Sequence, residues 1–305
     1  MKAKFIFLIL ILMNAVIYAQ QDSQYSQYMY NTVNVNPAYS GSRGAMSVFL
    51  LHRTQWVGLD GAPVTNNFSI HSPIAQSNFG LGISVVNDRI GISDENIIST
   101  DMSYTIQASE SYKLSFGIKA TANILSVDFT RLTVRPGQVP TIGEYNINNR
   151  FAPNFGAGIY YHSEKTYLGL SIPAFLETEY YDDNATSVAS EKMHIYFIAG
   201  KVFDLSQTVK FKPALLTKLV NGAPLQVDLS GNFSFNDKFI LGLAYRKDAA
   251  FSVMAGFQIN DSWLVGYGYD LESTKLANYN SGSHEIFLRY ELFKNYDRII
   301  SPRFF

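Results

Sequence analysis

The sequence predicts an all-β fold, a transmembrane outer-membrane β-barrel of about 14 antiparallel strands with short periplasmic turns and longer outer loops. Two observations predict it. Apolar and polar side chains alternate with a period of two along most of the chain, as they do in a sheet with one polar and one apolar face. The connections between these segments are alternately short and long, which a soluble β-sandwich has no reason to show.

The composition agrees with this class. Only 16% of the 305 residues are charged and 14% are aromatic, too few charges for a typical soluble surface. Mean hydropathy is close to zero, which argues against a helical membrane protein. The chain has no cysteine, so disulfides and thiolate metal sites are excluded. With a net charge of −1, the chain has no excess of basic residues that would indicate nucleic-acid binding.

The N-terminus has the pattern of a secretory signal peptide. Lys2 and Lys4 precede an apolar run over residues 5–16, and Ala19 supplies a small residue at the cleavage point. The run is too short for a membrane anchor, and no later stretch has 18 uninterrupted apolar residues. We therefore interpret residues 1–19 as a signal peptide that exports the chain.

Residues 20–43 form a separate N-terminal segment. It is rich in Asn and Tyr and has no helical or strand period, while Asn36-Pro37 and Ser40-Gly41 are turn signals. A barrel of this strand number leaves a roomy lumen unless something fills it. We predict that residues 20–43 form a periplasmic or plug segment, with 126–152 as a second candidate plug.

The barrel is predicted to span residues 44–293. In its clearest segment, Leu114, Phe116 and Ile118 share one face, whereas the residues between them share the other. The predicted strands are 44–53, 64–71, 79–87, 95–107, 112–125, 153–161, 166–172, 192–203, 207–219, 224–235, 239–246, 250–259, 262–269 and 283–293.

The connections set the topology. Those after even-numbered strands, such as 108–111 and 236–238, are short, whereas 126–152, 173–191 and 270–282 follow odd-numbered strands and are long. An even number of strands returns the C-terminus to the periplasm, so residues 294–305 are predicted to be a periplasmic tail. The barrel must close, because an open edge would leave backbone groups unsatisfied in lipid.

No catalytic constellation stands out, and the chain is predicted not to be an enzyme and to need no cofactor or metal. The sequence has no zincin motif, nucleophile elbow or P-loop. His284 and Glu285 are adjacent in a strand and therefore point to opposite faces. The histidines have no metal-ligand spacing; they are His52, His71, His162, His194 and His284.

Charges on the predicted lumen face are mixed in sign. They are Lys113, Lys119, Lys212, Lys218, Asp228, Glu285, Arg289 and Glu291. A field of one sign would indicate ion selectivity, and its absence weakens the interpretation as a porin.

Five short motifs, in order along the chain, resemble one known family. The first spans residues 27–63 and includes Asn36-Pro37-Ala38-Tyr39 and Arg53-Thr54-Gln55-Trp56. The others are Gly80-x-Gly82 with Asp88-Arg89-Ile90-Gly91, then Tyr267-Gly268-Tyr269-Asp270, Gly282-Ser283-His284-Glu285-Ile286 and Ser301-Pro302-Arg303-Phe304-Phe305. Together they resemble the PorP/SprF family of type IX secretion system membrane proteins. Ser23, Ser40 and Phe304 depart from the family pattern.

The resemblance implies an outer-membrane protein of Bacteroidota that binds protein. Such a protein would be a component of the type IX secretion apparatus, or a dedicated partner of an exported surface protein such as a gliding adhesin. Its expected partners are the periplasmic ring and outer-membrane components of that system, the exported protein and the lipid bilayer. The alternatives are an outer-membrane channel or hydrophobic-solute transporter and, last, an outer-membrane enzyme.

Topology divides the motif residues between the two ends of the barrel. An outer-rim set is predicted to shape the mouth or hold the exported partner: Arg53, Gln55, Trp56, Gly61, Pro63, Asp88, Gly91, Asp270, His284 and Glu285. A periplasmic set is predicted to meet the secretion machinery: Asn36, Pro37, Tyr39, Gly41, Ser301, Pro302 and Arg303.

Overall fold

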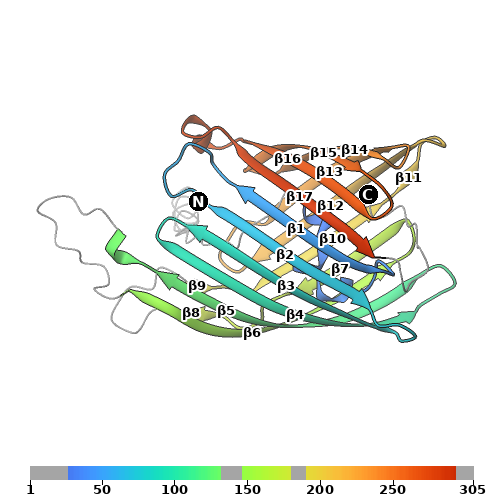
Figure 1. Ribbon diagram of the computed structural model, residues 1–305, viewed down its shortest axis with the longest axis horizontal. Helices are drawn as coiled ribbons and strands as arrows, with labels where there is room; N and C mark the ends of the chain where they lie inside the picture. Colours follow the sequence, from blue (N-terminus) through green and yellow to red (C-terminus); the bar gives the residue numbers. More distant parts are fainter. Residues whose placement is uncertain (1–26, 132–145, 180–189, 293–305) are drawn as a thin grey trace, which may run out of the picture.

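The computed structural model describes residues 27–131, 146–179 and 190–292. Within these ranges, fourteen antiparallel strands form a closed barrel, which confirms the predicted fold class (Figure 1). The wall strands are β1 (Met46–Thr54), β2 (Val64–Pro73), β3 (Phe79–Ile90), β4 (Ser93–Gln107), β5 (Lys113–Val127), β6 (Ile147–His162), β7 (Thr166–Ile172), β10 (His194–Lys201), β12 (Val209–Val220), β13 (Gln226–Phe235), β14 (Phe239–Arg246), β15 (Ala250–Gln258), β16 (Trp263–Glu272) and β17 (Ser283–Leu292).

The pairing of the first and last wall strands closes the ring. β1 pairs with β17 along its whole length, from Met46 opposite Leu292 to Thr54 opposite His284. β10 pairs with β12, and the two-residue strand β11 (Phe203–Asp204) pairs with β12 just beyond β10. All other neighbours in the wall are consecutive in the chain. The short strands β8 (Thr178–Glu179) and β9 (Ser190–Glu191) pair with each other in a separate sheet.

Each wall strand overlaps one predicted segment. The largest difference is β6, which begins at Ile147 rather than at residue 153. The second candidate plug was residues 126–152. Its residues 126–127 and 147–152 instead continue β5 and β6 away from the barrel. The segment 132–145 between these strands lies outside the described residues.

The long connections all lie at one end of the barrel, whereas the connections at the other end are short turns (Figure 1). We call the end with the long connections the outer end and the end with the short turns the periplasmic end. The short helix η5 (Lys275–Asn278) and the 55–63 loop are at the outer end. No helix in the described ranges has the length and apolar character needed to cross a membrane.

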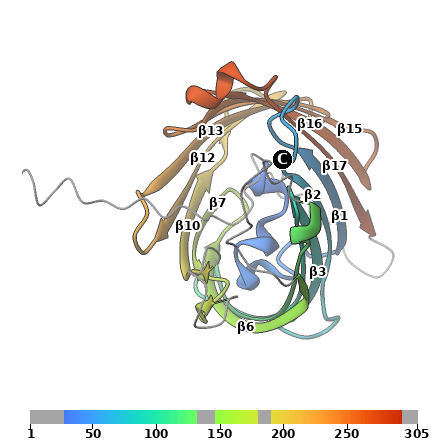
Figure 2. The ribbon, with the colours of Figure 1, turned by 90° about the vertical axis from the view of Figure 1, so that its left-hand side faces the viewer.

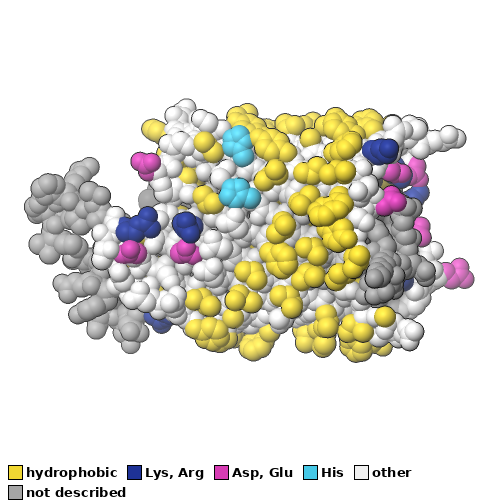
Figure 3. Space-filling model, viewed as in Figure 1, with side chains coloured by type: hydrophobic (Ala, Val, Ile, Leu, Met, Phe, Trp, Pro, Cys, Tyr) yellow, Lys and Arg dark blue, Asp and Glu magenta, His cyan; other side chains and the backbone are white. Residues whose placement is uncertain are grey.

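Exterior and lumen differ as the two-residue period requires. Large apolar side chains point outward from the wall strands, among them Leu243 (65% exposed) and Ile118 (57% exposed). On the face that Figure 3 shows, such side chains form an apolar band. The intervening positions point inward and are mostly small and polar, such as Ser84, Ser99 and Ser230. An apolar exterior of this extent is stable in lipid and not in water.

The N-terminal segment lies inside the barrel (Figure 2). Residues 27–45, which we call the plug, contain three 3₁₀ helices: η1 (Tyr28–Tyr30), η2 (Thr32–Asn34) and η3 (Pro37–Tyr39). All three residues of η1 and of η3 are buried. Together with residues of the wall, they form the main apolar cluster of the molecule.

The wall has glycine where the plug backbone comes closest. A Cβ at Gly117 of β5 would overlap the backbone of Pro37 and Ala38, and one at Gly158 of β6 would overlap the Asn36 side chain. Side chains at these two positions would therefore displace η3. The wall and the plug are complementary in shape, and the glycines are part of that fit.

We expect Gly117→Ala to lower the free energy of unfolding by about 1–3 kcal/mol, because the new methyl group overpacks a rigid backbone contact. Gly256→Ala is the matched control, since a Cβ at Gly256 would lie 3.4 Å from its nearest neighbour, the Ile240 Cβ. Urea titrations of the refolded proteins in lipid vesicles measure the free energy of unfolding of both variants. Equal unfolding free energies for the two variants would contradict the close docking of η3.

Candidate functional site

The fold of the plug is encoded locally at Asn36. Its side-chain Oδ1 accepts a hydrogen bond from the Ala38 backbone N–H at 3.0 Å and so caps η3, which Pro37 begins. The amide Nδ2 of the same side chain donates to the carbonyl of Ile159 in the wall at 3.0 Å. One side chain thus starts the helix and fixes it to β6.

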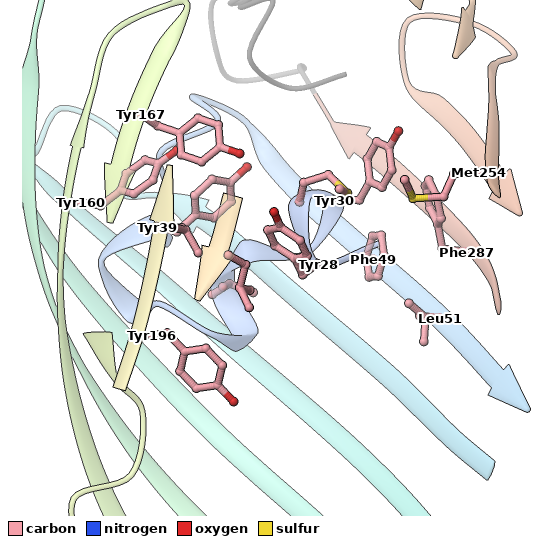
Figure 4. Packing of buried hydrophobic residues seen from close by; sticks show 14 of the residues in the cluster. Tyr28, Tyr30, Tyr39, Phe49, Leu51, Tyr160, Tyr167, Tyr196, Met254 and Phe287 are labelled. Atoms are coloured by element: carbon pink, nitrogen blue, oxygen red, sulfur yellow. The ribbon is translucent and has the colours of Figure 1, made fainter. Parts of the chain in front are cut away.

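Aromatic rings dock the plug on two sides of the lumen (Figure 4). The Tyr30 ring stacks on Phe287 of β17 with centroids 4.6 Å apart, and Phe287 stacks on Phe49 of β1 at 5.3 Å. Tyr39 meets Tyr160 of β6 edge to face at 5.4 Å. Burial raises the pKa of Tyr30 to about 12, so its phenol stays protonated at neutral pH.

An outer ion cluster lies at one end of the plug and consists of Arg53, Asp270 and Glu285. The Arg53 guanidinium is 2.7 Å from Asp270 Oδ2 and 3.0 Å from Glu285 Oε2. All three side chains are less than 5% exposed. Glu285 Oε1 also accepts the backbone N–H of Gln27 at 3.0 Å, so the cluster holds the first described residue of the plug.

A periplasmic ion cluster lies at the other end of the plug and consists of Arg43, Arg289 and Glu291. Arg43 forms an ion pair with Glu291 and donates a hydrogen bond to the Tyr39 hydroxyl at 3.3 Å. The Gly41 backbone N–H donates to His71 Nδ1 at 3.2 Å in the same region. Buried charge pairs with several hydrogen bonds have well-defined geometry, so this cluster fixes where the plug enters β1.

Strands β2, β4 and β5 hold the middle of the plug through polar contacts. Lys119 of β5 pairs with Asp101 of β4 at 3.1 Å and reaches the carbonyl of Val33 at 3.4 Å. Asn31 donates to Asn67 at 2.9 Å. The plug is therefore bonded to the wall along its length, not only at its ends.

The outer rim is built around the loop of residues 55–63. On one side, the Val57 N–H donates to the Gly282 carbonyl at 2.9 Å, and the Ser281 N–H donates to the Val57 carbonyl at 2.7 Å. On the other side, the Gly91 N–H donates to the Gly61 carbonyl at 2.9 Å. The loop thereby ties the β16–β17 connection to the β3–β4 turn.

Trp56 adopts an unusual backbone conformation at the start of this loop. Its φ is 45°, a left-handed value that is rare for a bulky residue. Its N–H donates to Ser283 Oγ at 3.2 Å, and its indole Nε1–H donates to Glu272 Oε2 at 3.0 Å. Bonds to both strands of the neighbouring connection maintain this conformation.

The predicted outer-rim residues thus fall into two groups. Gln55, Trp56, Gly61, Pro63 and Gly91 lie in the rim connections. By contrast, Arg53, Asp88, Asp270 and Glu285 point into the lumen and are buried, with Asp88 accepting a hydrogen bond from Thr65 at 2.6 Å. Because these four side chains are buried, they are not exposed to a partner at the rim.

His284 points outward, whereas Glu285 points inward, as their strand positions predicted. The His284 ring bonds the Tyr267 hydroxyl at 2.6 Å on the exterior. Of the predicted periplasmic set, Asn36, Pro37, Tyr39 and Gly41 belong to the plug. Ser301, Pro302 and Arg303 lie outside the described residues.

The sequence patterns did not reveal the plug contacts of the wall, such as those of Lys119 and Asn67. A usable signal was present in the glycines at lumen-facing positions, Gly80, Gly82, Gly117, Gly158 and Gly268. Within the described ranges, no three His, Asp or Glu side chains gather closely enough to hold a metal ion.

A family model described as "Type IX secretion system membrane protein PorP/SprF" matches residues 17–290. No curated protein matches the chain in sequence. Among solved structures, the chain is similar to the CymD monoaromatic hydrocarbon channel, with a TM-score of 0.49 and 11% identity over 90% of this chain and 94% of that one. It is also similar to a Pseudomonas aeruginosa FadL homologue, with a TM-score of 0.46 and 12% identity over 87% of this chain and 94% of that one.

We expect Arg53→Met to lower the free energy of unfolding by about 3–5 kcal/mol, because it leaves two buried carboxylates without their cation. Arg89→Met is the control: Arg89 pairs with Asp94 at 3.2 Å on the exterior, where about 0–1 kcal/mol is expected. Urea titration in vesicles measures both variants.

The triple variant R53M/D270N/E285Q removes all three charges and should recover most of the stability that R53M loses. If R53M were no less stable than R89M, the outer ion cluster would have no structural role.

Proposed function

Since the chain belongs to the PorP/SprF family of type IX secretion system membrane proteins, we propose that it joins an exported surface protein to the secretion machinery. In this proposal, the outer rim binds the exported protein and the periplasmic end binds the machinery. The exported protein would be a surface adhesin of the gliding type, and the chain would reach the outer membrane of a Bacteroidota cell through its signal peptide.

The observation that carries this proposal is the occupied lumen. The plug is bonded to the wall by the outer ion cluster, the periplasmic ion cluster and the stacked aromatic rings between them. A barrel whose lumen holds such a plug has less open space for solutes, and it presents its two ends as surfaces. This favours a protein-binding role over that of a diffusion channel.

The outer rim supports the proposal with an exposed apolar surface. Val57 (38% exposed), Leu276 (39%) and Tyr279 (69%) lie on the 55–63 loop and the β16–β17 connection, which are joined by backbone hydrogen bonds. Apolar side chains on a fixed, water-facing rim are typical of protein interaction sites. We name these three residues the rim patch and propose that it contacts the exported protein.

The periplasmic end would contact the secretion machinery through exposed groups. The buried Asn36 and Tyr39 are held in the lumen, so direct contact falls to other parts of residues 20–43 and 294–305 and to the short turns. Those turns carry ion pairs at the surface, among them Lys165 with Asp204 and Lys210 with Asp237. No catalytic step is part of this function.

The test is a mild-detergent pull-down of the tagged protein from its native membrane, with the co-purifying proteins identified. Recovery of periplasmic ring components or of one large surface protein supports the proposal. Recovery of the barrel alone, from a preparation that preserves other membrane complexes, would favour a channel or a hydrophobic-solute transporter instead.

We expect the triple variant V57S/L276S/Y279S to reduce recovery of the exported protein about tenfold or more, because a loss of 1.4 kcal/mol corresponds to tenfold in affinity. Recovery of periplasmic components should not change. Leu205→Ser is the matched control, since Leu205 is exposed apolar surface at the periplasmic end. Equal losses of the exported protein for both variants would count against the rim patch.

The intact protein should conduct ions poorly in planar bilayers, and deletion of residues 20–36 should raise its conductance, because the deletion removes η1 and η2 from the lumen. Heat-modifiable gel migration confirms that the shortened barrel is folded. High conductance of the intact protein, unchanged by the deletion, would show that the plug does not close the lumen.

A further inference from the structure

The exterior of β1–β4 carries a row of polar side chains at the outer end of the apolar band. His52, Asn66, Asn87 and Asn96 come from four neighbouring strands and lie directly opposite one another in the strand pairing. His52 Nδ1 is 2.8 Å from Asn66 Oδ1, and Asn87 Nδ2 donates to Asn96 Oδ1 at 3.0 Å. The row is therefore a hydrogen-bonded strip on the membrane-facing side of the wall.

A groove of about 540 Å³ joins this strip to the apolar band. His52, Asn66 and Asn87 line one part of it. Apolar side chains that point into the membrane line the remainder: Leu50, Phe68, Val85, Ile286 and Leu288. Its volume is within the range of ligand sites, roughly 300–1,000 Å³. The lining is mostly apolar and has a small polar part at one end, which matches an acyl chain that carries a polar head.

The position of the groove indicates where its occupant comes from. The apolar part is continuous with the band that faces lipid, and the polar part lies two to three residues from the 55–63 loop, where lipid headgroups meet a barrel. An occupant must therefore enter from the outer leaflet of the membrane.

The polar groups indicate the kind of headgroup. Because Asn66 Oδ1 accepts, His52 Nδ1–H donates, which leaves His52 Nε2 as an acceptor and Asn66 Nδ2 as a donor toward the groove. The nearest charged pair is Arg89 and Asp94, 3.2 Å apart, and Asp94 Oδ1 also accepts hydrogen bonds from Asn87 Nδ2 at 2.8 Å and from Asn96 Nδ2 at 3.2 Å. The neutral groups of His52 and Asn66, with the Asp94 carboxylate nearby, match hydroxyl groups, which both donate and accept, better than they match an anionic phosphate.

We propose that this groove binds one glycolipid of the outer leaflet. Its sugar hydroxyls bond His52 and Asn66, and one acyl chain lies along Leu50, Phe68 and Leu288. This site is independent of the proposed secretion partners.

The experiment is native mass spectrometry of the full-length protein released from nanodiscs. The discs contain equal amounts of a diglycosyl diacylglycerol and a phosphatidylcholine with the same acyl chains. We expect about one retained glycolipid per barrel, and retention at least about tenfold lower in H52L/N66L, which removes the polar groups but keeps an apolar surface. Thr217→Leu, an outward polar-to-apolar change on β12, should not alter retention.

A second variant, Val85→Trp, fills the groove and leaves the polar strip intact, and it should also lose the glycolipid. Heat-modifiable migration confirms that each variant is folded. Equal retention of both lipids by the wild type, preferential retention of the phospholipid, or unchanged retention in H52L/N66L would each overturn the proposal.

Discussion

The structure depends first on the requirement that backbone groups in lipid be hydrogen-bonded within the protein. Antiparallel strands satisfy this requirement only if the sheet closes, and closure here joins β1 to β17, the first and last strands of the wall. Closure also creates a lumen that fourteen strands alone do not fill. The plug, the polar lumen face and the paired charges follow from that unfilled space.

The plug fills this space through contacts of three kinds. Close backbone approach, as between η3 and Gly117, excludes water and determines shape. Charge pairs determine position, because a buried carboxylate such as Glu285 is tolerated only where its cation and donors are in place. The aromatic stack of Tyr30, Phe287 and Phe49 adds apolar burial between the two ion clusters. Together these contacts give one docked geometry, as a fixed binding platform requires.

Much of this fold could be predicted from the sequence, because the two-residue period is local and strong. The two-residue period did not predict the start of β6. There, Asn148, Asn149 and Arg150 put polar groups on both faces of a strand that projects beyond the membrane. The period also assigns a residue to a face without giving its surroundings. Arg53, Asp270 and Glu285 belong to the predicted outer-rim set, but their contact with the plug depends on Gln27, whose segment has no period. Non-local docking of an aperiodic segment leaves little pattern in a single sequence beyond the lumen-facing glycines that it packs against.

The location of the plug anchors has a further physical consequence. β17 supplies Glu285 to the outer ion cluster, Phe287 to the aromatic stack, and Arg289 and Glu291 to the periplasmic ion cluster; β1 supplies Arg53 and Phe49. The plug therefore docks most strongly across the β1–β17 pairing. That pairing joins residues more than 200 positions apart, so it has the largest loop-closure entropy in the wall. Contacts between the plug and these two strands offset the entropy cost of forming the β1–β17 pairing. They also couple the 55–63 loop at the outer rim to the plug residues near the periplasmic end through a single strand pair.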